Sequence, residues 1–202
     1  NQHIEALAIC FLHAYANPSH EERAREIAKA LYPDLRITTS NEVLPFMREY
    51  ERWTTTTINA YVQPLTSRYL DNLESGLAEM GFHGHLLVMT SSGGMATPEL
   101  ARRFPVRLVE SGPAAGALMA AFLGRQAGEP ALLSFDMGGT STDVGVVANG
   151  SIGYTTAWEI EFGLPISAPF IDLTTMGAGG GSIAWINKGG MLQVGPQSAG
   201  AV

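Results

Sequence analysis

The residues best suited to chemistry lie in the segment Asp136-Met137-Gly138-Gly139-Thr140-Ser141-Thr142-Asp143. Its two glycines allow backbone N–H groups to converge on an anion without steric cost, and hydroxyl side chains stand beside them. The aspartates at its two ends supply carboxylate oxygens, of which Mg²⁺ takes one or two together with water. The segment therefore predicts a binding site for a nucleotide phosphate and its Mg²⁺. The alternative interpretation is an ordinary tight β-turn.

Two common phosphate motifs do not fit this segment. It runs on into Val144-Gly145-Val146-Val147, which is a strand pattern, whereas a dinucleotide-binding glycine turn opens a helix. The sequence also lacks the Gly-Lys-Ser/Thr of a P-loop. We therefore predict a phosphate-binding hairpin, with one strand over residues 131–136 and the other over residues 143–148.

The elements upstream of the hairpin are expected to alternate between strand and helix. Apolar spacing predicts strands over residues 4–12, 35–39 and 86–90, and helices over residues 19–31, 58–80 and 114–123. Ser19 and Glu22 have the spacing of a capping box, and the run Thr54 to Thr57 is a poor helix interior but a good helix entry. The third strand is expected to be buried and to end in Ser91-Ser92-Gly93-Gly94, at the strand end where α/β sheets bind ligands.

Composition narrows the class of protein. The chain has 202 residues, 46% of them hydrophobic, with 23 glycines and 11 prolines, which favours a mixed α/β fold over a helix bundle. Its net charge is -7 and its 12 Lys and Arg are not clustered, so nucleic acid is not an expected partner. Cys10 is the single cysteine, which excludes an internal disulfide and predicts a buried, inert thiol. No stretch approaches the roughly 20 apolar residues that span a bilayer, and we expect a cytoplasmic protein without membrane contact.

The motifs also carry a resemblance. Asp136 to Val144 resembles the second phosphate hairpin of the actin, sugar-kinase and heat-shock ATPase superfamily, and Glu110-Ser111-Gly112-Pro113-Ala114-Ala115-Gly116 resembles the connecting helix that precedes it. Asn17-Pro18-Ser19-His20-Glu21, Thr90 to Met95 and Met176-Gly177-Ala178-Gly179-Gly180-Gly181 are similar to the hydantoinase A and oxoprolinase family, a likeness that covers essentially the whole chain.

The resemblance implies an actin-like (ribonuclease-H-like) ATPase fold, a mixed sheet with flanking helices that is incomplete in this chain. It implies an α/β subdomain over residues 1–100 and, over residues 101–202, an actin-like subdomain with the connecting helix and the second hairpin. No second Asp-x-Gly-Gly-Thr occurs, so the first phosphate hairpin is expected outside this chain. The chain is accordingly expected to be an internal segment of a larger protein and inactive when isolated.

The resemblance further implies an ATP-dependent hydrolase that opens a hydantoin or lactam ring through phosphate activation, with ATP and Mg²⁺ as cofactors. A B subunit or B-like domain and self-association are the implied protein contacts. The resemblance also implies roles for single residues. The residues expected to bind phosphate are Gly138, Gly139, Thr140 and Thr142. Those expected to bind the metal are Asp136 and Asp143, and those expected to take part in catalysis are Glu110 and Asp143.

Three alternatives remain open from the sequence. The loop with Gly179 and Gly180 either binds nucleotide or substrate, or merely turns a crowded chain. Glu110 either orients a water or the metal, or is a plain dipole partner of the helix that follows it. The enzyme is either the hydrolase, a beta-type subunit of an ATP-dependent ketone carboxylase, or, in a different class, an actin-like nucleotide sensor.

Overall fold

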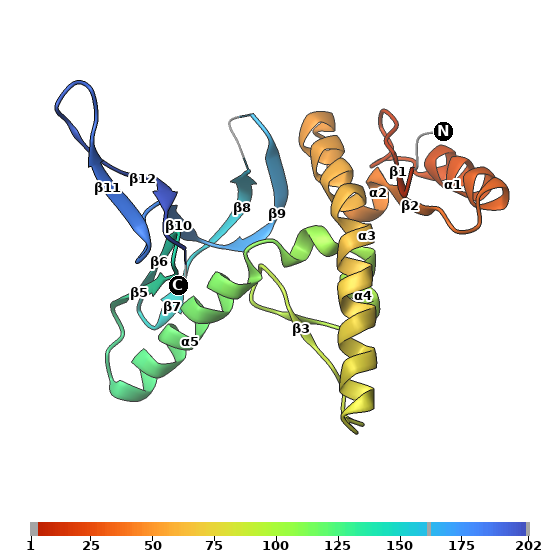
Figure 1. Ribbon diagram of the computed structural model, residues 1–202. Helices are drawn as coiled ribbons and strands as arrows, with labels where there is room; N and C mark the ends of the chain where they lie inside the picture. The colour runs from red at the N-terminus through yellow and green to blue at the C-terminus, as the bar shows by residue number, and fades with distance from the viewer. Residues whose placement is uncertain (1–3, 161–162, 201–202) are drawn as a thin grey trace. The chain divides into compact units, whose positions relative to one another are not determined.

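The structure is a computed structural model that describes residues 4–160 and 163–200 (Figure 1). The chain forms two compact units. The first contains the residues up to Val109 together with residues 156–170, and the second contains residues 110–155 and the residues from Ile171 onward. Helices and strands occur in both units, so the mixed α/β content expected from the sequence is confirmed.

The first unit opens with a strand, a helix and a second strand. β1 (Ala6–Ile9) pairs in parallel with β2 (Arg36–Thr39), and α1 (Ser19–Leu31) connects them, as predicted. β1 is shorter than the expected strand over residues 4–12, because its partner β2 ends at Thr39, opposite Ile9.

The predicted capping box at the start of α1 is wrong. The residue before the helix is Pro18, and no side chain caps the helix from that position. Instead, the Ser19 amide donates to Asn17 Oδ1 at 3.1 Å, and Glu22 pairs with Arg25 one turn further on. The asparagine therefore binds a free amide at this end, a role that the sequence pattern gave to serine.

After the short α2 (Ser40–Val43), α3 runs from Glu49 to Glu79. The prediction that this helix starts after the threonine run is wrong, since Thr54 to Thr57 lie inside it. Threonine hydroxyls bond back to the preceding turn: Thr55 Oγ1 donates to Glu51 O and Thr56 Oγ1 to Arg52 O, both at 2.6 Å. This local bonding satisfies hydroxyls that face the interior and makes the run compatible with a helix.

A buried polar network fixes α3 to the N-terminal strand region. The Glu21 carboxylate, fully buried, accepts from the Phe11 amide at 2.8 Å and the Ser40 hydroxyl at 2.6 Å. The Arg52 guanidinium, also fully buried, donates to Ser40 Oγ at 3.1 Å and to the Phe11 carbonyl at 2.9 Å. Each charge is stabilised by several hydrogen bonds, which is the condition under which a protein interior tolerates ionised groups.

The predicted buried strand over residues 86–90 is wrong in length and in pairing. β3 (Val88–Met89) is two residues long and forms an antiparallel pair with β4 (Met95–Ala96). The Ser91 to Gly94 turn therefore closes a small hairpin and does not end a parallel strand. α4 (Pro98–Arg103) and the 3₁₀ helix η1 (Pro105–Leu108) follow, and Asn59 of α3 joins them by donating to Arg103 O and accepting from the Val106 amide.

β8 (Tyr154–Glu159) and β9 (Pro165–Ile171) form a two-stranded sheet along which the chain passes between the units. Residues of β9 complete the core of the first unit, a cluster of Val43, Phe104, Val106, Ile166 and Phe170. No helix within residues 4–160 and 163–200 combines the length and apolarity needed to cross a bilayer.

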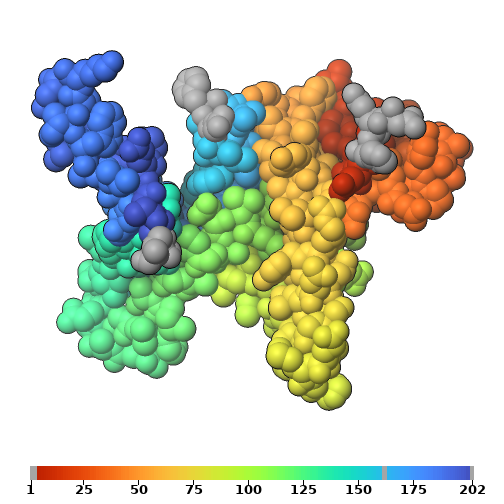
Figure 2. Space-filling view, viewed as in Figure 1, coloured from red at the N-terminus to blue at the C-terminus, as the bar shows by residue number. Residues whose placement is uncertain are grey.

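The second unit is a helix on a small sheet. α5 (Ser111–Ala127) precedes β5 (Leu132–Met137) and β6 (Thr142–Ala148), which form an antiparallel pair extended by β7 (Ser151–Ile152) and β10 (Leu173–Met176). The hairpin of β11 (Ser182–Ile186) and β12 (Leu192–Ser198) extends away from this sheet (Figure 2). α5 extends beyond the predicted helix over residues 114–123 at both ends, and Gly128, whose φ of 78° suits a helix C-terminus, follows its last residue.

The two faces of the β5–β6 pair differ. Small side chains of α5 pack on one face, in a buried cluster of Ala114, Ala117, Ile152 and Ile171. The other face is apolar but open: Leu133, Phe135 and Met137 of β5 are 67%, 62% and 51% exposed, and Val146, opposite Leu133, is 62% exposed. Because strand side chains alternate, the residues between them point to the α5 side.

Candidate functional site: the β5–β6 turn

The hairpin predicted from the sequence is present. β5 and β6 pair with Asp136 opposite Asp143, and the Gly138 amide closes the turn by donating to Ser141 O at 2.9 Å. The chain then continues as a strand, as expected. Within the described part of the chain, the backbone amides of Gly139 and Thr140 donate to no acceptor. The turn therefore presents two unused N–H groups, the donor set that an anion needs.

The two aspartates lie on the face that α5 covers. Asp136 Oδ2 is 3.5 Å from the point where a Cβ on Gly116 of α5 would lie. Asp143, being opposite Asp136 in the register, shares its face, and Asp143 Oδ1 accepts a hydrogen bond of 2.6 Å from Thr175 of β10. Sequence reasoning missed Thr175, which the pairing of β10 with β6 places beside Asp143.

Glu110 stands at the head of α5 in a left-handed conformation, with φ 61° and ψ 21°. Such a conformation costs a non-glycine residue free energy and is found more often at functional sites than elsewhere. Burial, and then the negative charge of Asp143, raise the pKa of the Glu110 carboxyl above its ordinary 4.5. Glu110 and Asp143, distant in sequence, are therefore electrostatically close in this unit.

The three carboxylates are mutually repulsive. Like charges directly opposite on neighbouring strands destabilise a sheet, and Glu110 adds a third negative charge near Asp143. Within residues 4–160 and 163–200, no group of three or more His, Cys, Asp or Glu side chains has the geometry of a metal cage. A bridging Mg²⁺, which needs one or two carboxylates and completes its shell with water and phosphate, fits this open arrangement.

The glycine loop after β10 packs directly on the turn. Gly180 N donates to Gly138 O at 2.9 Å, and Gly181 N donates to Gly139 O at 2.7 Å. A Cβ on Gly179 would lie 2.7 Å from Gly138 O and 2.8 Å from Ser141 N, so no side chain fits there. The atoms that a side chain would meet are backbone, so glycine is required at position 179 of the loop, whereas a Cβ at Gly138 of the turn would meet only Ser141 O at 3.7 Å.

Not every predicted donor is free. Thr142, fully buried, uses its hydroxyl to donate to Ala178 O at 2.6 Å. The Gly180 amide is similarly engaged by Gly138 O. The structure thus brings all the predicted residues to one place, with Gly139 and Thr140 presenting open donors and with Thr142, Gly179 and Gly180 joining the loop to the turn.

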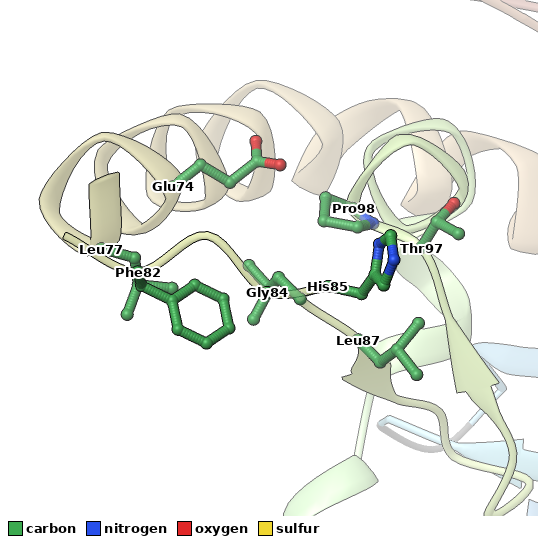
Figure 3. Close-up of a pocket in the computed structure, with 9 residues that line it drawn as sticks. Glu74, Leu77, Phe82, Gly84, His85, Leu87, Thr97 and Pro98 are labelled. Carbon is green, nitrogen blue, oxygen red and sulfur yellow. The ribbon is translucent and has the colours of Figure 1, made fainter.

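Cavities also occur in the first unit. One of 440 Å³ lies at the C-terminal end of α3, where Glu74 and Leu77 face Phe82, Gly84 and His85 of the following segment (Figure 3). Its carboxylate, on Glu74, is already paired with Arg102. This cavity therefore offers little unused chemistry compared with the turn.

Comparison with known proteins identifies the class to which this fold and site belong. The sequence profile of the hydantoinase/oxoprolinase family matches residues 52–202, and that of the hydantoinase/oxoprolinase N-terminal region matches residues 1–32. The chain therefore belongs to the hydantoinase/oxoprolinase family, which confirms the resemblance seen in its motifs.

Individual relatives match along nearly all of the chain. An uncharacterized protein of Methanocaldococcus jannaschii is 43% identical over 98% of the chain and 31% of its own length. The caprolactamase alpha subunit of Pseudomonas jessenii is 37% identical over 99% of the chain and 29% of its length, and the 5-oxoprolinase of Dictyostelium discoideum is 33% identical over 98% and 16%. The chain thus spans less than a third of each of these relatives.

Two solved structures share the fold. The ATP-dependent caprolactamase of Pseudomonas jessenii superposes with a TM-score of 0.81 at 38% identity. Acetone carboxylase, solved free of nucleotide and described as carrying out ATP-dependent acetone carboxylation, gives the same TM-score at 28% identity. Each comparison covers 98% of this chain and 28% of the other.

Proposed function

We propose that this chain is part of an ATP-dependent hydrolase of cyclic amides, and that the β5–β6 turn holds the phosphates of ATP. The observation that carries the proposal is the pair of unused amides at Gly139 and Thr140, next to the carboxylates of Asp136 and Asp143. Family membership supports it, as do the names of two relatives, a caprolactamase and a 5-oxoprolinase.

The proposed reaction balances as one lactam, one ATP and two waters giving one amino acid, ADP and phosphate. The amide oxygen attacks the γ-phosphorus, and the bond from that phosphorus to the bridging oxygen breaks. Water then adds to the activated carbon, the ring C–N bond breaks and the nitrogen takes up a proton. A second water releases phosphate from the acyl phosphate that remains. Activation is needed because an amide carbon is a weak electrophile.

The residues of the turn divide this work. The amides of Gly139 and Thr140 donate to phosphate oxygens, while Gly138 closes the turn. The loop contacts of Thr142, Gly179 and Gly180 hold the turn in that conformation, which is a positioning role. Such preorganised donors act without reorganising as charge develops.

Asp136 and Asp143 are the residues that would hold Mg²⁺, and Thr175 orients the second of them. When bound, Mg²⁺ supplies positive charge to the phosphate oxygens during transfer. We assign to Glu110 the binding and orienting of a water beside Asp143, because burial and the charge of Asp143, which raise the pKa of its carboxyl, show that the two side chains interact.

We further propose that the complete protein has an actin-like ATPase fold in which a second phosphate hairpin faces this one. The chain spans less than a third of its relatives, which leaves ample sequence for that hairpin and for a partner subunit such as the name "subunit alpha" indicates for caprolactamase. The 202 residues alone would then bind ATP weakly, since they supply part of the donors.

A carboxylase is the second candidate, favoured by the structural match to acetone carboxylase. The test is phosphate release by the complete protein, with any subunit that co-purifies, in the presence of oxoproline, hydantoin, or acetone with bicarbonate. Stimulation by a cyclic amide with formation of the ring-opened product supports the hydrolase. Stimulation by acetone and bicarbonate alone supports the carboxylase, and no stimulation by any of them favours a nucleotide sensor.

The site itself is tested with Asp143→Asn and a matched control, Asp172→Asn, at an exposed aspartate of the same unit. We expect Asp143→Asn to lower turnover by roughly 100-fold or more, because a metal's stabilisation of phosphoryl charge is worth several kcal/mol. Turnover equal to that of Asp172→Asn in a folded Asp143→Asn protein would remove the metal role from this residue.

A further inference from the structure

A second cavity of the first unit, distinct from the nucleotide turn, has the character of a small-molecule pocket. Its volume is 430 Å³, within the range of about 300–1,000 Å³ that such pockets occupy. The Ser91 to Gly94 turn, α4, η1 and the middle of β9 surround it. Most of the wall is apolar, formed by side chains that include Val43, Leu44, Pro45, Leu100, Phe104 and Pro169.

The glycine-rich turn supplies hydroxyl groups to this wall. Thr90 and Ser92 both line the cavity, with their hydroxyl oxygens 3.1 Å apart. Ser91, between them, points the other way and is buried, donating to Arg107 O at 2.7 Å and contacting Val109 O. Ser91 therefore anchors the turn to η1, while Thr90 and Ser92 line the cavity, and the Thr90 hydroxyl also donates to Gly94 O at 3.1 Å.

A guanidinium group lies at the same wall. Arg107 lines the cavity, and its Cζ lies 4.5 Å from the ring centroid of Phe104, itself a buried wall residue. Within residues 4–160 and 163–200, Arg107 has no carboxylate partner, whereas its neighbour Arg103 is paired with Glu42. Stacking on an aromatic ring fixes the guanidinium and leaves its N–H fork available for a planar anion.

We propose that this cavity binds a lactam that carries a carboxylate group. Arg107 donates two hydrogen bonds to the carboxylate, the Thr90 and Ser92 hydroxyls bond to the ring amide, and the apolar wall packs on the ring methylenes. This inference rests on the proposed function and narrows its substrate class, since lactams with and without a carboxylate occur among the substrates named for the relatives.

The test uses the complete protein with its partner subunit and two probes that share one ring: 5-oxoproline, which bears a carboxylate, and 2-pyrrolidinone, which does not. Wild type, Arg107→Gln and Arg107→Lys are compared, with Arg23→Gln as the control because Arg23 is an exposed arginine of α1 in the same unit. KM and kcat are measured for each probe, and the thermal midpoint of each variant reports folding.

We expect Arg107→Gln to raise KM for 5-oxoproline by roughly 10- to 100-fold, the cost of one hydrogen-bonded charge pair, and to leave KM for 2-pyrrolidinone unchanged. Arg107→Lys keeps the positive charge but loses the paired N–H donors of the guanidinium. Its KM for 5-oxoproline is therefore expected to lie between those of wild type and Arg107→Gln. Equal changes for the two probes, or no change for either, would overturn the proposal.

Calorimetric titration of 5-oxoproline into wild type and Arg107→Gln, without ATP, separates this inference from the proposed function. Binding to wild type that is weakened in Arg107→Gln supports the pocket even where no probe stimulates phosphate release. If both lactams are turned over but 5-oxoproline binds equally well to wild type and Arg107→Gln, the hydrolase is supported and the proposed pocket is overturned. Absence of 5-oxoproline binding to the folded wild-type protein also overturns it.

Discussion

The contact between the glycine loop and the β5–β6 turn makes Gly179→Ala the most informative single substitution. The added Cβ would lie 2.7 Å from Gly138 O and 2.8 Å from both Ser141 N and the Thr140 carbonyl carbon. All three neighbours are backbone atoms, so the loop must lift off the turn. Overpacking of this kind costs about 1–3 kcal/mol, and weakening the Gly180 hydrogen bond to Gly138 O adds about 1 kcal/mol.

A local cost of about 2–4 kcal/mol corresponds to roughly 30- to 1,000-fold faster hydrogen exchange at amides protected by this contact. We would measure exchange in peptides covering residues 176–182 of the complete protein by mass spectrometry, together with ATP affinity, which should fall as the turn loosens. Gly177→Ala is the matched control, because a Cβ at Gly177 meets nothing within 4 Å. Equal exchange rates in the two variants would refute the close-packing argument.

Three further predictions concern other groups. Because the folded-state pKa of Glu110 is raised, wild-type stability falls as pH rises above 4.5, so Glu110→Gln should raise the thermal midpoint of nucleotide-free protein at pH 7 and leave it unchanged at pH 4. Burial, with the charge of Glu21, raises the pKa of Cys10 to about 11 from 9.0, so iodoacetamide should label native Cys10 about 100-fold more slowly than the unfolded chain at pH 8. Asn59→Ala should destabilise the protein by about 1–3 kcal/mol in urea unfolding, because the buried Val106 amide and the partly buried Arg103 carbonyl lose their hydrogen bonds to Asn59.

The Glu110 and Asn59 predictions each have a control in the same unit or element, and for Cys10 the unfolded chain is the reference. Glu129→Gln, at an exposed carboxylate, should show no difference between pH 4 and pH 7, and Asn72→Ala, on the exposed side of α3, should be nearly neutral. A lower midpoint for Glu110→Gln at pH 7, rapid labelling of native Cys10, or an Asn59→Ala protein as stable as Asn72→Ala would each contradict the corresponding argument.

The β5–β6 hairpin could be predicted because its signal is local. Asp136, the two glycines and Asp143 lie within one turn and its flanking residues, and a strand pattern on each side settles the geometry. The connecting helix was predicted for similar reasons, since its alanine-rich run has a helical composition. The prediction failed at Thr54 to Thr57, because Thr55 and Thr56 donate their hydroxyls to backbone carbonyls one turn earlier, and composition does not show these local bonds.

Other features of the sites depend on contacts between distant segments. Thr175 reaches Asp143 through the pairing of β10 with β6, and the glycine loop reaches the turn through the same pairing. No short-range pattern marks such pairs. The role proposed for Arg107 could not be predicted from the sequence either. The sequence does not show that Arg107 stacks on Phe104, or that Glu42 pairs with Arg103 and not with Arg107.

The open apolar face of the β5–β6 pair has a practical consequence. If these 202 residues were produced alone, this face would be exposed to solvent through Leu133, Phe135, Met137 and Val146. Exposed apolar strand surfaces promote association. Oligomers formed by these 202 residues alone would then involve that face. Light scattering of a Phe135→Lys variant is the check: a shift to monomer shows that this face mediates the association, and an unchanged oligomer points to a different surface.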